Sequence, residues 1–411
     1  MKTSLVPASF DDWRSLARRR LPDFLFGFVD GGAFDEVTLR ANTEAWRKVR
    51  LRQHVLRDVS QMHVGTQFFG RAANMPLALA PVGLGGSLRR RGEVQAARAA
   101  EAAGVPFTLC TPAICSLEEV RAATQAPFWF QLYMLRDRGI VRDLLQRAAA
   151  VGCDALVFTV DLARLGIRRS DIRHGMTTPP TGRTRRARLR SVLSRPSWLW
   201  DVPVKGGPLV FGNLKAYVPK ATNLEDFKAW VDDQFDASVT WKDIEWLRTQ
   251  WSGPIIIKGV LEAEDARMAA QIGVQGIVVS NHGGRQLDCT AATAEALPQL
   301  AEAVAGRGLT VLVDGGIRNG HDIIKARALG ADGVMVGRPW AHANAAGGEG
   351  GVRQWLAHME TELTNSLGLM GIARLDDVDR RHLIEEPVGP GAAQSIPSNN
   401  RRYAAQNETD T

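Results

Sequence analysis

The chain has 411 residues, of which 45% are hydrophobic and 23% are charged, the balance of a globular protein with a large core. Its net charge of +7 is local, because six arginines lie between Arg183 and Arg195 with no acid among them. The remainder is close to neutral, which argues against a protein coated in basic residues for nucleic acid. No stretch is apolar for long enough to span a bilayer.

Residues 1–70 precede the first apolar run and are expected to form short helices that pack on the main domain. Eight short apolar runs follow, at 76–81, 106–110, 127–133, 155–161, 254–259, 276–281, 309–316 and 332–337. The runs are continuous and not alternating, which is typical of parallel strands buried on both faces. Helical stretches such as GEVQAARAAEAAG separate most of them, so the sequence predicts a (β/α)8 TIM barrel over residues 71–384. A doubly wound sheet is the alternative, but its G-x-G-x-x-G turn after the first strand is missing.

Two regions lie outside the repeat. Residues 163–240 form an insert after the fourth strand that is far longer than one crossover needs. The tail, residues 385–411, is rich in Pro, Gly, Asn and Ser and is expected to be disordered.

The active site of such a barrel lies at the carboxyl ends of its strands. Nearly every predicted strand ends in a polar or otherwise special residue: Pro81, Cys110, Gln131, Tyr133, Thr159, Asp161, Lys258, Ser280, His282, Asp314, Gly337 and Arg338. A barrel without activity has no reason to place Lys, His and Asp in register at one end. The pattern therefore predicts an enzyme.

The motif SNHGGRQLD, residues 280–288, carries the most specific chemistry. His282 can accept a proton near neutral pH, and Arg285 can bind a carboxylate with two parallel hydrogen bonds. Gly283 and Gly284 let the backbone approach a ligand closely. A base beside a carboxylate clamp suits a 2-hydroxy acid, whereas the alternative is a surface turn with a solvated arginine.

Two further features indicate a phosphate-bearing cofactor. The loops DGGIRNG (314–320) and GRP (337–339) follow the seventh and eighth strands, where many barrels bind phosphate. Lys258 is either a Schiff-base former or a fixed positive charge, and beside a phosphate cofactor the fixed charge is favoured. The alternative without a functional role is a lysine that extends to solvent.

Together these residues resemble the FMN-dependent L-2-hydroxy acid dehydrogenase and oxidase family, which includes glycolate oxidase, (S)-mandelate dehydrogenase and the flavin domain of flavocytochrome b2. The resemblance runs from about residue 10 to about 385 through LPDFLFGFVDGGAFDEVTLRAN, APVGL, FQLY, FTVD, IKGV, SNHGGRQLD, DGGIRNG and GRP. RRGEVQAA, LRDRG, GNLKAY and WKDIEWLR most resemble bacterial respiratory L-lactate dehydrogenases.

The resemblance implies FMN as cofactor and a role for each matching residue. His282 would remove the substrate proton, Asp161 would orient its imidazole, and Tyr133 would contact the substrate oxygen. Arg168 and Arg285 would bind the carboxylate, and Lys258 would lie near flavin N1 and O2. The remaining flavin contacts would be Pro81, Val82, Gly83, Cys110, Gln131, Thr159 and Ser280 at the ring, and Asp314, Gly315, Gly316, Arg318, Gly337 and Arg338 at the ribityl phosphate.

Four positions depart from the family pattern. Phe28 replaces a substrate-binding Tyr, which removes a hydrogen bond to a charged group worth about 1.5–3 kcal/mol. Cys110 replaces a Ser near the flavin, Pro112 stands where a larger side chain can line the pocket, and Ala163 replaces a common Pro. These departures leave the identity of the 2-hydroxy acid open.

The electron acceptor and the location are also open. Electrons pass to a quinone or another acceptor, or to O2 with formation of hydrogen peroxide; the small Gly83 beside the flavin favours the dehydrogenase. Residues 183–200 combine arginines with Leu193, Trp198, Leu199 and Trp200, which suits an anionic membrane surface. The equal alternative is a mobile loop that covers the active site. A non-redox FMN barrel and a barrel without catalysis are the other classes considered.

The cysteines and the N-terminus bear on the redox state and the location of the protein. Cys110, Cys115, Cys153 and Cys289 form no C-x-x-C pair and are interpreted as reduced thiols, with no metal site. The N-terminus has no apolar segment of a secretory signal, so a cytoplasmic protein is expected, peripheral on the inner face of the membrane if the insert binds there. No nucleic acid is expected as a partner, and the family implies a homotetramer.

Overall fold

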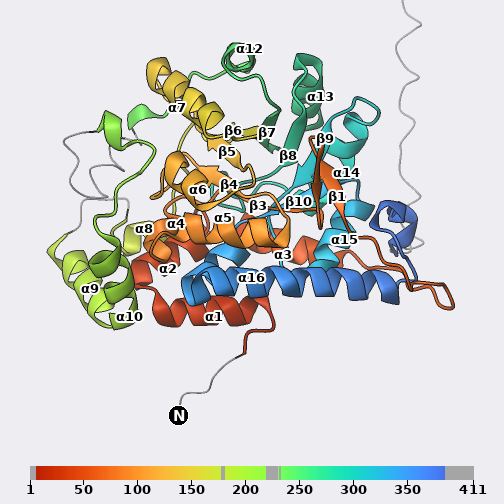
Figure 1. Ribbon diagram of the computed structural model, residues 1–411, viewed down its shortest axis with the longest axis horizontal. Coiled ribbons are helices and arrows are strands. Elements are labelled where there is room, and N and C mark those ends of the chain that lie inside the picture. Colours follow the sequence, from red (N-terminus) through yellow and green to blue (C-terminus); the bar gives the residue numbers. More distant parts are fainter. Residues whose placement is uncertain (1–5, 177–180, 219–229, 231–232, 385–411) are drawn as a thin grey trace, which may run out of the picture.

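A computed structural model describes residues 6–176, 181–218, 230 and 233–384, and its centre is a barrel of parallel strands (Figure 1). The strands are β3 (Leu77–Leu79), β4 (Thr108–Cys110), β5 (Trp129–Leu132), β6 (Ala155–Thr159), β7 (Ile255–Val260), β8 (Gly276–Val279), β9 (Thr310–Val313) and β10 (Gly333–Val336). Their order is β3-β10-β9-β8-β7-β6-β5-β4, and the Leu79 amide closes the ring by donating to the Pro106 carbonyl at 2.8 Å. All eight predicted strands and the (β/α)8 fold are thus confirmed.

Burial explains why the strands read as continuous apolar runs. Every residue of β3, β4, β5, β6, β8 and β10 is buried, since each strand faces the barrel interior on one side and helices on the other. The side chains inside the barrel form a cluster of their own: Phe68, Ala73, Ala78, Ala80, Trp129, Ala155, Val157, Ile256, Val278, Leu312 and Met335. The interior is therefore a packed core and not a channel.

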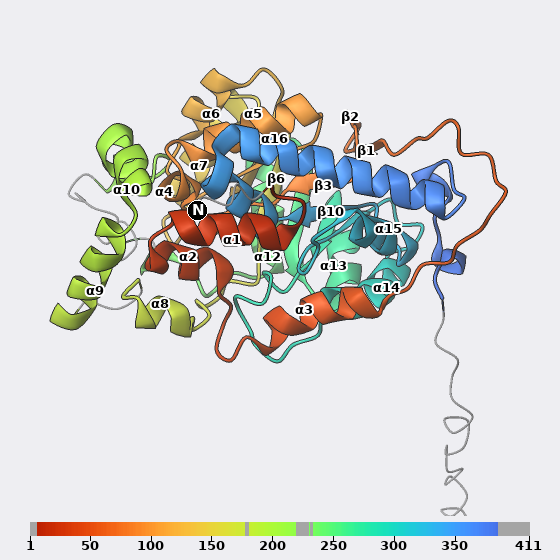
Figure 2. The ribbon, with the colours of Figure 1, turned by 90° about the horizontal axis from the view of Figure 1, so that it is seen from below.

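Helices surround the barrel and extend from the N-terminal segment. The crossover helices are α4 (Gly85–Leu88), α5 (Gly92–Ala103), α6 (Leu117–Ala123), α7 (Arg138–Ala150), α12 (Trp241–Gln250), α13 (Ala263–Ile272), α14 (Thr293–Ala303), α15 (Gly320–Ala328) and α16 (Arg338–Leu369). The N-terminal segment forms α1 (Phe10–Arg20), α2 (Asp23–Asp30) and α3 (Val37–Lys48), and the short turns η3 (Leu375–Asp377) and η4 (Arg380–His382) follow α16. Helix α1 lies along α16, while α3 lies on the other side, next to α14 (Figure 2).

A small hairpin that the sequence did not predict closes the amino end of the barrel. Its strands are β1 (Thr66–Phe68) and β2 (Arg71–Ala73). The rings of Phe68 and Phe69 lie 5.8 and 5.7 Å from that of Trp129, the first residue of β5. With strands only three residues long, the hairpin leaves no periodic signal in the sequence.

The insert contains α8 (Arg169–Arg173), α9 (Gly182–Leu193), α10 (Pro196–Leu199), the π-helical turn η1 (Trp200–Val204) and the 3-10 turn η2 (Lys215–Tyr217). Trp198 anchors it, since its indole is 3% exposed and donates to the Ser87 carbonyl at 2.8 Å. Assigning Trp198 to a membrane-facing surface was therefore wrong; Leu193 and Trp200, at 61% and 59% exposure, are outside. The predicted disordered tail, 385–411, lies outside the described residues.

Candidate active site

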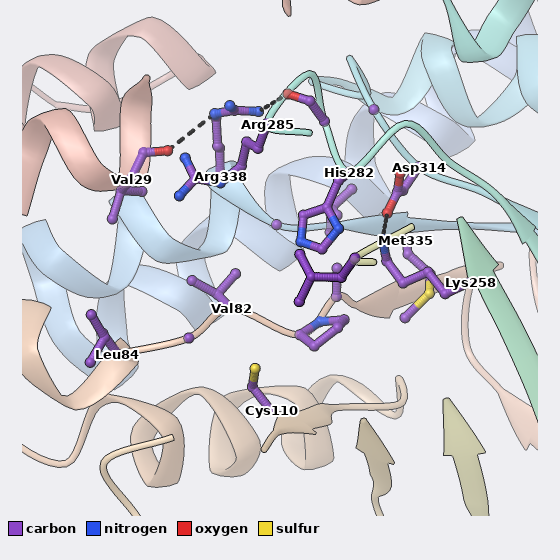
Figure 3. Close-up of a pocket in the computed structure, with 18 of the residues that line it drawn as sticks. Val29, Val82, Leu84, Cys110, Lys258, His282, Arg285, Asp314, Met335 and Arg338 are labelled. Atoms are coloured by element: carbon purple, nitrogen blue, oxygen red, sulfur yellow. Dashed lines mark hydrogen bonds and ion pairs between the residues drawn. The ribbon is translucent and has the colours of Figure 1, made fainter. Parts of the chain in front are cut away.

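The polar strand ends meet at a cavity of about 200 Å³ in the mouth of the barrel. Most of the predicted site residues line it: Phe28, Pro81, Val82, Gly83, Cys110, Tyr133, Arg168, Lys258, His282, Arg285, Asp314, Gly315, Gly316, Arg318, Gly337 and Arg338. Figure 3 shows Lys258, from β7, and His282 and Arg285, from the loop after β8, around this space. Residues spread over 310 positions of the sequence are thus brought into one site.

Four predicted site residues, Gln131, Thr159, Asp161 and Ser280, lie behind the lining and hold it in place. The Gln131 amide donates to Thr159 Oγ1 at 3.0 Å and accepts from Cys110 Sγ at 3.1 Å. Ser280 Oγ accepts hydrogen bonds from Lys258 Nζ at 2.9 Å and from the His282 amide at 3.0 Å. Their contribution is to fix the orientation of groups that face the cavity.

His282 and Asp161 form the central pair. Nδ1 of the imidazole lies 2.9 Å from Asp161 Oδ1, which leaves Nε2 as the free basic atom. Burial lowers the pKa of His282, and the attraction of Asp161 only partly offsets this, so the imidazole is neutral at pH 7. Burial opposes ionisation of Asp161 too, but His282 and Lys258 bring the pKa of its carboxyl below the usual value. A neutral imidazole beside a carboxylate is poised to accept a proton.

The glycines after His282 are required by the backbone. His282, Gly283 and Gly284 have φ values of +57°, +64° and +73°, three consecutive left-handed residues. A Cβ on Gly284 would lie 2.5 Å from the Leu39 amide nitrogen. The motif thus needs glycine both for its turn and for the close approach of α3.

Other residues of SNHGGRQLD tie the N-terminal helices to the barrel. Asn281 exchanges two 2.8 Å hydrogen bonds with Asn42 of α3. Asp288 accepts from the Thr38 amide at 2.8 Å, and the Gln286 amide donates to the Asp161 carbonyl at 2.8 Å. The stretch therefore organises its surroundings as well as supplying a base.

Arg168 and Arg285 flank the ring of Phe28, with guanidinium carbons 5.9 and 5.1 Å from its centroid. Burial, together with the charges of Arg168 and Arg338, lowers the pKa of Arg285. The buried Nε of Arg168 has no hydrogen-bond partner among the residues that the structure describes. Asp171 Oδ2, 3.5 Å from Arg168, supplies one carboxylate for these two arginines, and the remaining positive charge around the open space favours an anionic ligand there.

Arg318 and Arg338 occupy the neighbouring part of the cavity. Burial lowers the pKa of Arg318 to about 9 and that of Arg338 to about 10. The guanidinium of Arg338 donates to the carbonyls of Val29, Gly31 and Gly283, so it also holds the end of α2 over the site (Figure 3). The sequence did not predict that the Arg338 side chain points to backbone oxygens, because Gly283 and Gly31 are about 50 and 300 residues away in sequence.

Lys258 is a fixed cation. Its Nζ lies 2.9 Å from Asp314 Oδ2, and its side chain is 4% exposed, which rules out a solvated lysine. Burial favours the neutral amine, but Asp314 and Asp161 outweigh it and raise the pKa of Lys258. An ammonium held in this way is a poor Schiff-base nucleophile and a good electrostatic partner for a developing anion.

The remaining lining fits a flavin mononucleotide. Gly337 precedes the 32-residue helix α16, and a Cβ there would lie no closer than 3.6 Å to a neighbouring atom, so its backbone faces open space. A helix N-terminus beside Arg318 and Arg338 is suited to a phosphate. The buried Oδ1 of Asp314, unpartnered within the described part of the chain, can accept from a ribityl hydroxyl.

Apolar walls that the sequence did not single out complete the cavity. Leu162, Leu165, Phe211 and Phe235 line it, and the Phe235 ring packs edge-on against Tyr133 at 5.3 Å. All but Leu162 belong to the insert, where no motif or strand end marks them. Only their apolarity within a polar, arginine-rich segment could have suggested a buried position.

Comparison with known proteins identifies the family of this chain. A family model described as FMN-dependent dehydrogenase matches residues 17–385. An L-lactate dehydrogenase of Caulobacter sp. (strain K31) is 52% identical over 92% of this chain and 98% of its own, and one of Yersinia pestis (strain Pestoides F) is 48% identical over the same shares. The structure of the monotopic membrane protein (S)-mandelate dehydrogenase matches with a TM-score of 0.87 and 33% identity, over 93% of this chain and all of that one. A mandelate oxidase structure matches with a TM-score of 0.78 and 38% identity, over 93% and 99%. The chain therefore belongs to the FMN-dependent dehydrogenases, the oxidoreductases that oxidise 2-hydroxy acids.

Proposed function

We propose that this enzyme oxidises L-lactate, or a similarly small L-2-hydroxy acid, to the 2-oxo acid and passes the electrons to an acceptor other than O2. The observation that carries the proposal is the neutral imidazole of His282, held by the Asp161 carboxylate, in one cavity with Arg168 and Arg285. When bound, FMN supplies the two-electron oxidation. The substrate preference rests on the relatives named L-lactate dehydrogenase at 52% and 48% identity.

In this proposal His282 is the base. Its Nε2 accepts the proton of the substrate hydroxyl, and Asp161 stabilises the imidazolium that forms. The 2.9 Å contact with Asp161 fixes the ring so that the free nitrogen is presented to the cavity. Tyr133, which also lines the cavity, contacts the substrate oxygen, and burial raises the pKa of its phenol and keeps it a hydrogen-bond donor.

Arg168 and Arg285 bind the carboxylate. Both guanidiniums are held against the Phe28 ring, and Arg285 is further fixed by bonds to the Phe28 and Gly31 carbonyls at 2.7 and 2.8 Å. Such pre-orientation lowers the cost of placing the substrate for proton transfer. Phe28 contributes shape and cation–π contact but no hydroxyl, so carboxylate binding depends on the two arginines.

The flavin-binding roles divide by chemistry. Lys258 supplies positive charge at the ring edge that becomes anionic, held there by Asp314. Pro81, Val82 and Gly83 pack on the ring, and Cys110 lies at its polar edge. Gln131, Thr159 and Ser280 lie behind the lining and orient the groups that face this edge. Gly315, Gly316, Arg318, Gly337 and Arg338 bind the ribityl phosphate.

For the acceptor we propose a membrane quinone. Leu189, Leu193, Trp200 and Val204 are 57–61% exposed on α9 and η1, interspersed with arginines. Apolar side chains between cations suit the interface of an anionic bilayer. The (S)-mandelate dehydrogenase that shares the fold is a monotopic membrane protein. None of the helices in the described residues is long and apolar enough to cross a membrane.

Product analysis tests both parts of the proposal. Purified enzyme is given L-lactate, D-lactate, glycolate or (S)-mandelate with a soluble quinone, in air and under argon, while 2-oxo acid and hydrogen peroxide are measured. We expect 2-oxo acid from L-lactate at equal rates in both atmospheres and little peroxide. Stoichiometric peroxide that replaces quinone reduction would identify an oxidase, and preference for (S)-mandelate would overturn the choice of substrate.

A further inference from the structure

A second cavity, of about 380 Å³, lies outside the catalytic site, between the insert and helices α4–α6. Its lining includes Gly86, Ile114 and Cys115, together with Val202, Gly206 and Leu209 of the insert. Three basic side chains line it, Arg90, Arg91 and Lys215. The proposed oxidation makes no use of this space.

The charges around this cavity are not balanced. Arg91 is paired with Glu119 at 2.6 Å, whereas Lys215 has no acidic partner among the described residues. A single carboxylate, Asp201, is shared by three arginines: Arg20 at 2.7 Å, Arg89 at 3.2 Å and Arg90 at 3.9 Å. Arg20, Arg89 and Asp201 lie next to the cavity and not in its lining. With them included, five basic groups stand against two carboxylates, an excess of three positive charges. An excess of two remains if the buried Glu93, which accepts from the Ile114 amide, is counted.

The electrostatics of Arg20 reflect this excess. Burial and then the charge of Arg89 lower the pKa of Arg20, although Asp201 opposes the change. The Nε of Arg20 is buried without a hydrogen-bond partner within the part of the chain described. A cluster of cations with unused donors is stabilised when an anion with several acceptor oxygens binds beside it.

The position of the cavity indicates where such an anion comes from. Turn η1 directs Val202 into the protein, where it lines the cavity, and Trp200 and Val204 to the outside, with 59% and 57% exposure. Lys205 lies 5.4 Å from the Trp200 ring. The basic cavity is therefore lined by the same turn, η1, that carries the exposed apolar side chains that we assign to the membrane face.

We propose that this cavity binds the phosphate of an anionic lipid headgroup, so that Trp200 and Val204 enter the bilayer while Arg90 and Lys215 hold one lipid. The proposal rests on the membrane association proposed above. It adds one defined phosphate site to the general attraction between a basic surface and an anionic bilayer. A soluble phosphate ester carries the same phosphate group and could bind the same site. The two modes of binding can be told apart by mutation. A defined site depends on the basic residues of the cavity, whereas general attraction depends equally on all exposed basic residues.

The test compares two charge-matched double variants in the full-length holoenzyme. Arg90→Gln with Lys215→Gln removes two charges from the cavity, and Arg185→Gln with Arg186→Gln removes two from the exposed face of α9. Flavin content and Tm confirm folding. Each variant is sedimented with vesicles of phosphatidylcholine alone or with phosphatidylglycerol, and titrated with glycerol phosphate by calorimetry.

General attraction predicts equal losses, about fivefold per charge removed near an anionic surface. The proposed site predicts that the cavity pair loses at least tenfold more affinity for phosphatidylglycerol vesicles than the α9 pair. It also predicts that only the cavity pair abolishes binding of glycerol phosphate. Equal losses, with no binding of glycerol phosphate by the wild type, would overturn the site.

Two other results separate the causes of failure. If glycerol phosphate binding depends on the cavity pair but vesicle binding does not, the ligand is a soluble phosphate ester and the lipid assignment is wrong. If the wild type binds no vesicle of either composition, membrane association itself fails. The lipid site is then wrong as well, because it depends on membrane association. The glycerol phosphate titration decides separately whether the cavity binds phosphate.

Discussion

The barrel mouth and the insert face both carry many cations, but they hold them in opposite ways. In the mouth Lys258 is 4% exposed and fixed by Asp314 and Ser280, and His282 is fixed by Asp161. On α9 only Ser191 is buried, and most of the arginines point to solvent. A reaction needs groups pre-oriented in a site from which water is excluded, whereas a surface that meets a fluid bilayer does not. Substitutions should therefore have large effects on rate in the mouth and small ones on association at the insert.

The largest effect is expected at His282. His282→Gln removes the base while keeping a polar side chain, so kcat should fall by about 10⁴-fold. The measurement is turnover of L-lactate with FMN content determined in parallel. His321→Gln, at an exposed histidine of α15, is the matched control and should leave turnover unchanged. Normal turnover in the His282 variant would exclude it as the base.

Asp161→Asn should lower kcat by roughly 10³-fold, because the amide no longer stabilises the imidazolium. Its pH dependence has a defined sign. Asp161 raises the pKa of His282 against the effect of burial, so its neutralisation lowers that pKa further. The acid limb of kcat/KM, where protonated His282 cannot accept a proton, should then move to lower pH. A limb that moves to higher pH would contradict the assignment.

Gly259 gives a test of positioning without touching a polar group. A Cβ at this residue, where φ is +112°, would lie 2.7 Å from Cβ and Cγ of Asp161. Gly259→Ala should displace the carboxylate and lower kcat by about 10²-fold. Gly273→Ala is the control, since φ is +79° there but no atom lies within 4 Å of the added Cβ. Both variants should lose stability from the positive φ, and Gly259→Ala should lose more because its Cβ overlaps Asp161. In folded, FMN-loaded enzyme, loss of rate is expected in Gly259→Ala alone; equal rates would refute the coupling.

Phe28→Tyr should strengthen carboxylate binding. A phenol hydroxyl between Arg168 and Arg285 can donate to the carboxylate, worth about 1.5–3 kcal/mol, or roughly ten- to a hundredfold in KM. Steady-state kinetics with L-lactate measure it, and Phe28→Leu serves as the control that removes the ring. An unchanged KM would show that the natural substrate carboxylate lies away from Phe28.

The smallest effect is expected for the exposed Trp200 of the insert, on vesicle binding. Trp200→Ala should weaken vesicle binding by about 1.5 kcal/mol, roughly tenfold, without changing Tm or turnover. Trp198→Ala should instead lower stability by about 3–5 kcal/mol, because that ring is buried against Ser87 and Phe24. Equal loss of stability in both variants would remove the distinction between an anchor and a membrane contact.

The sequence was informative wherever function is tied to a strand end. The eight continuous apolar runs follow from burial on both faces of a parallel strand, and Lys258, Asp314 and His282 lie at or just after the carboxyl ends of these strands, where they line the cavity. Contacts that depend on distant parts of the chain could not be predicted. The walls formed by Phe211 and Phe235, the bonds from Arg338 to the end of α2 and the burial of Trp198 each arise from packing between elements far apart in sequence.

The most direct test of the account is the visible spectrum of the holoenzyme as L-lactate, glycolate and (S)-mandelate are added in turn without oxygen, with D-lactate as control. If His282 is the base, L-lactate should bleach the bound FMN fastest among these acids, and D-lactate should not bleach it. The His282→Gln variant should bind FMN but be reduced far more slowly. Bound flavin that stays oxidised with every acid, or a wild type and a His282 variant that are reduced equally fast, would contradict it.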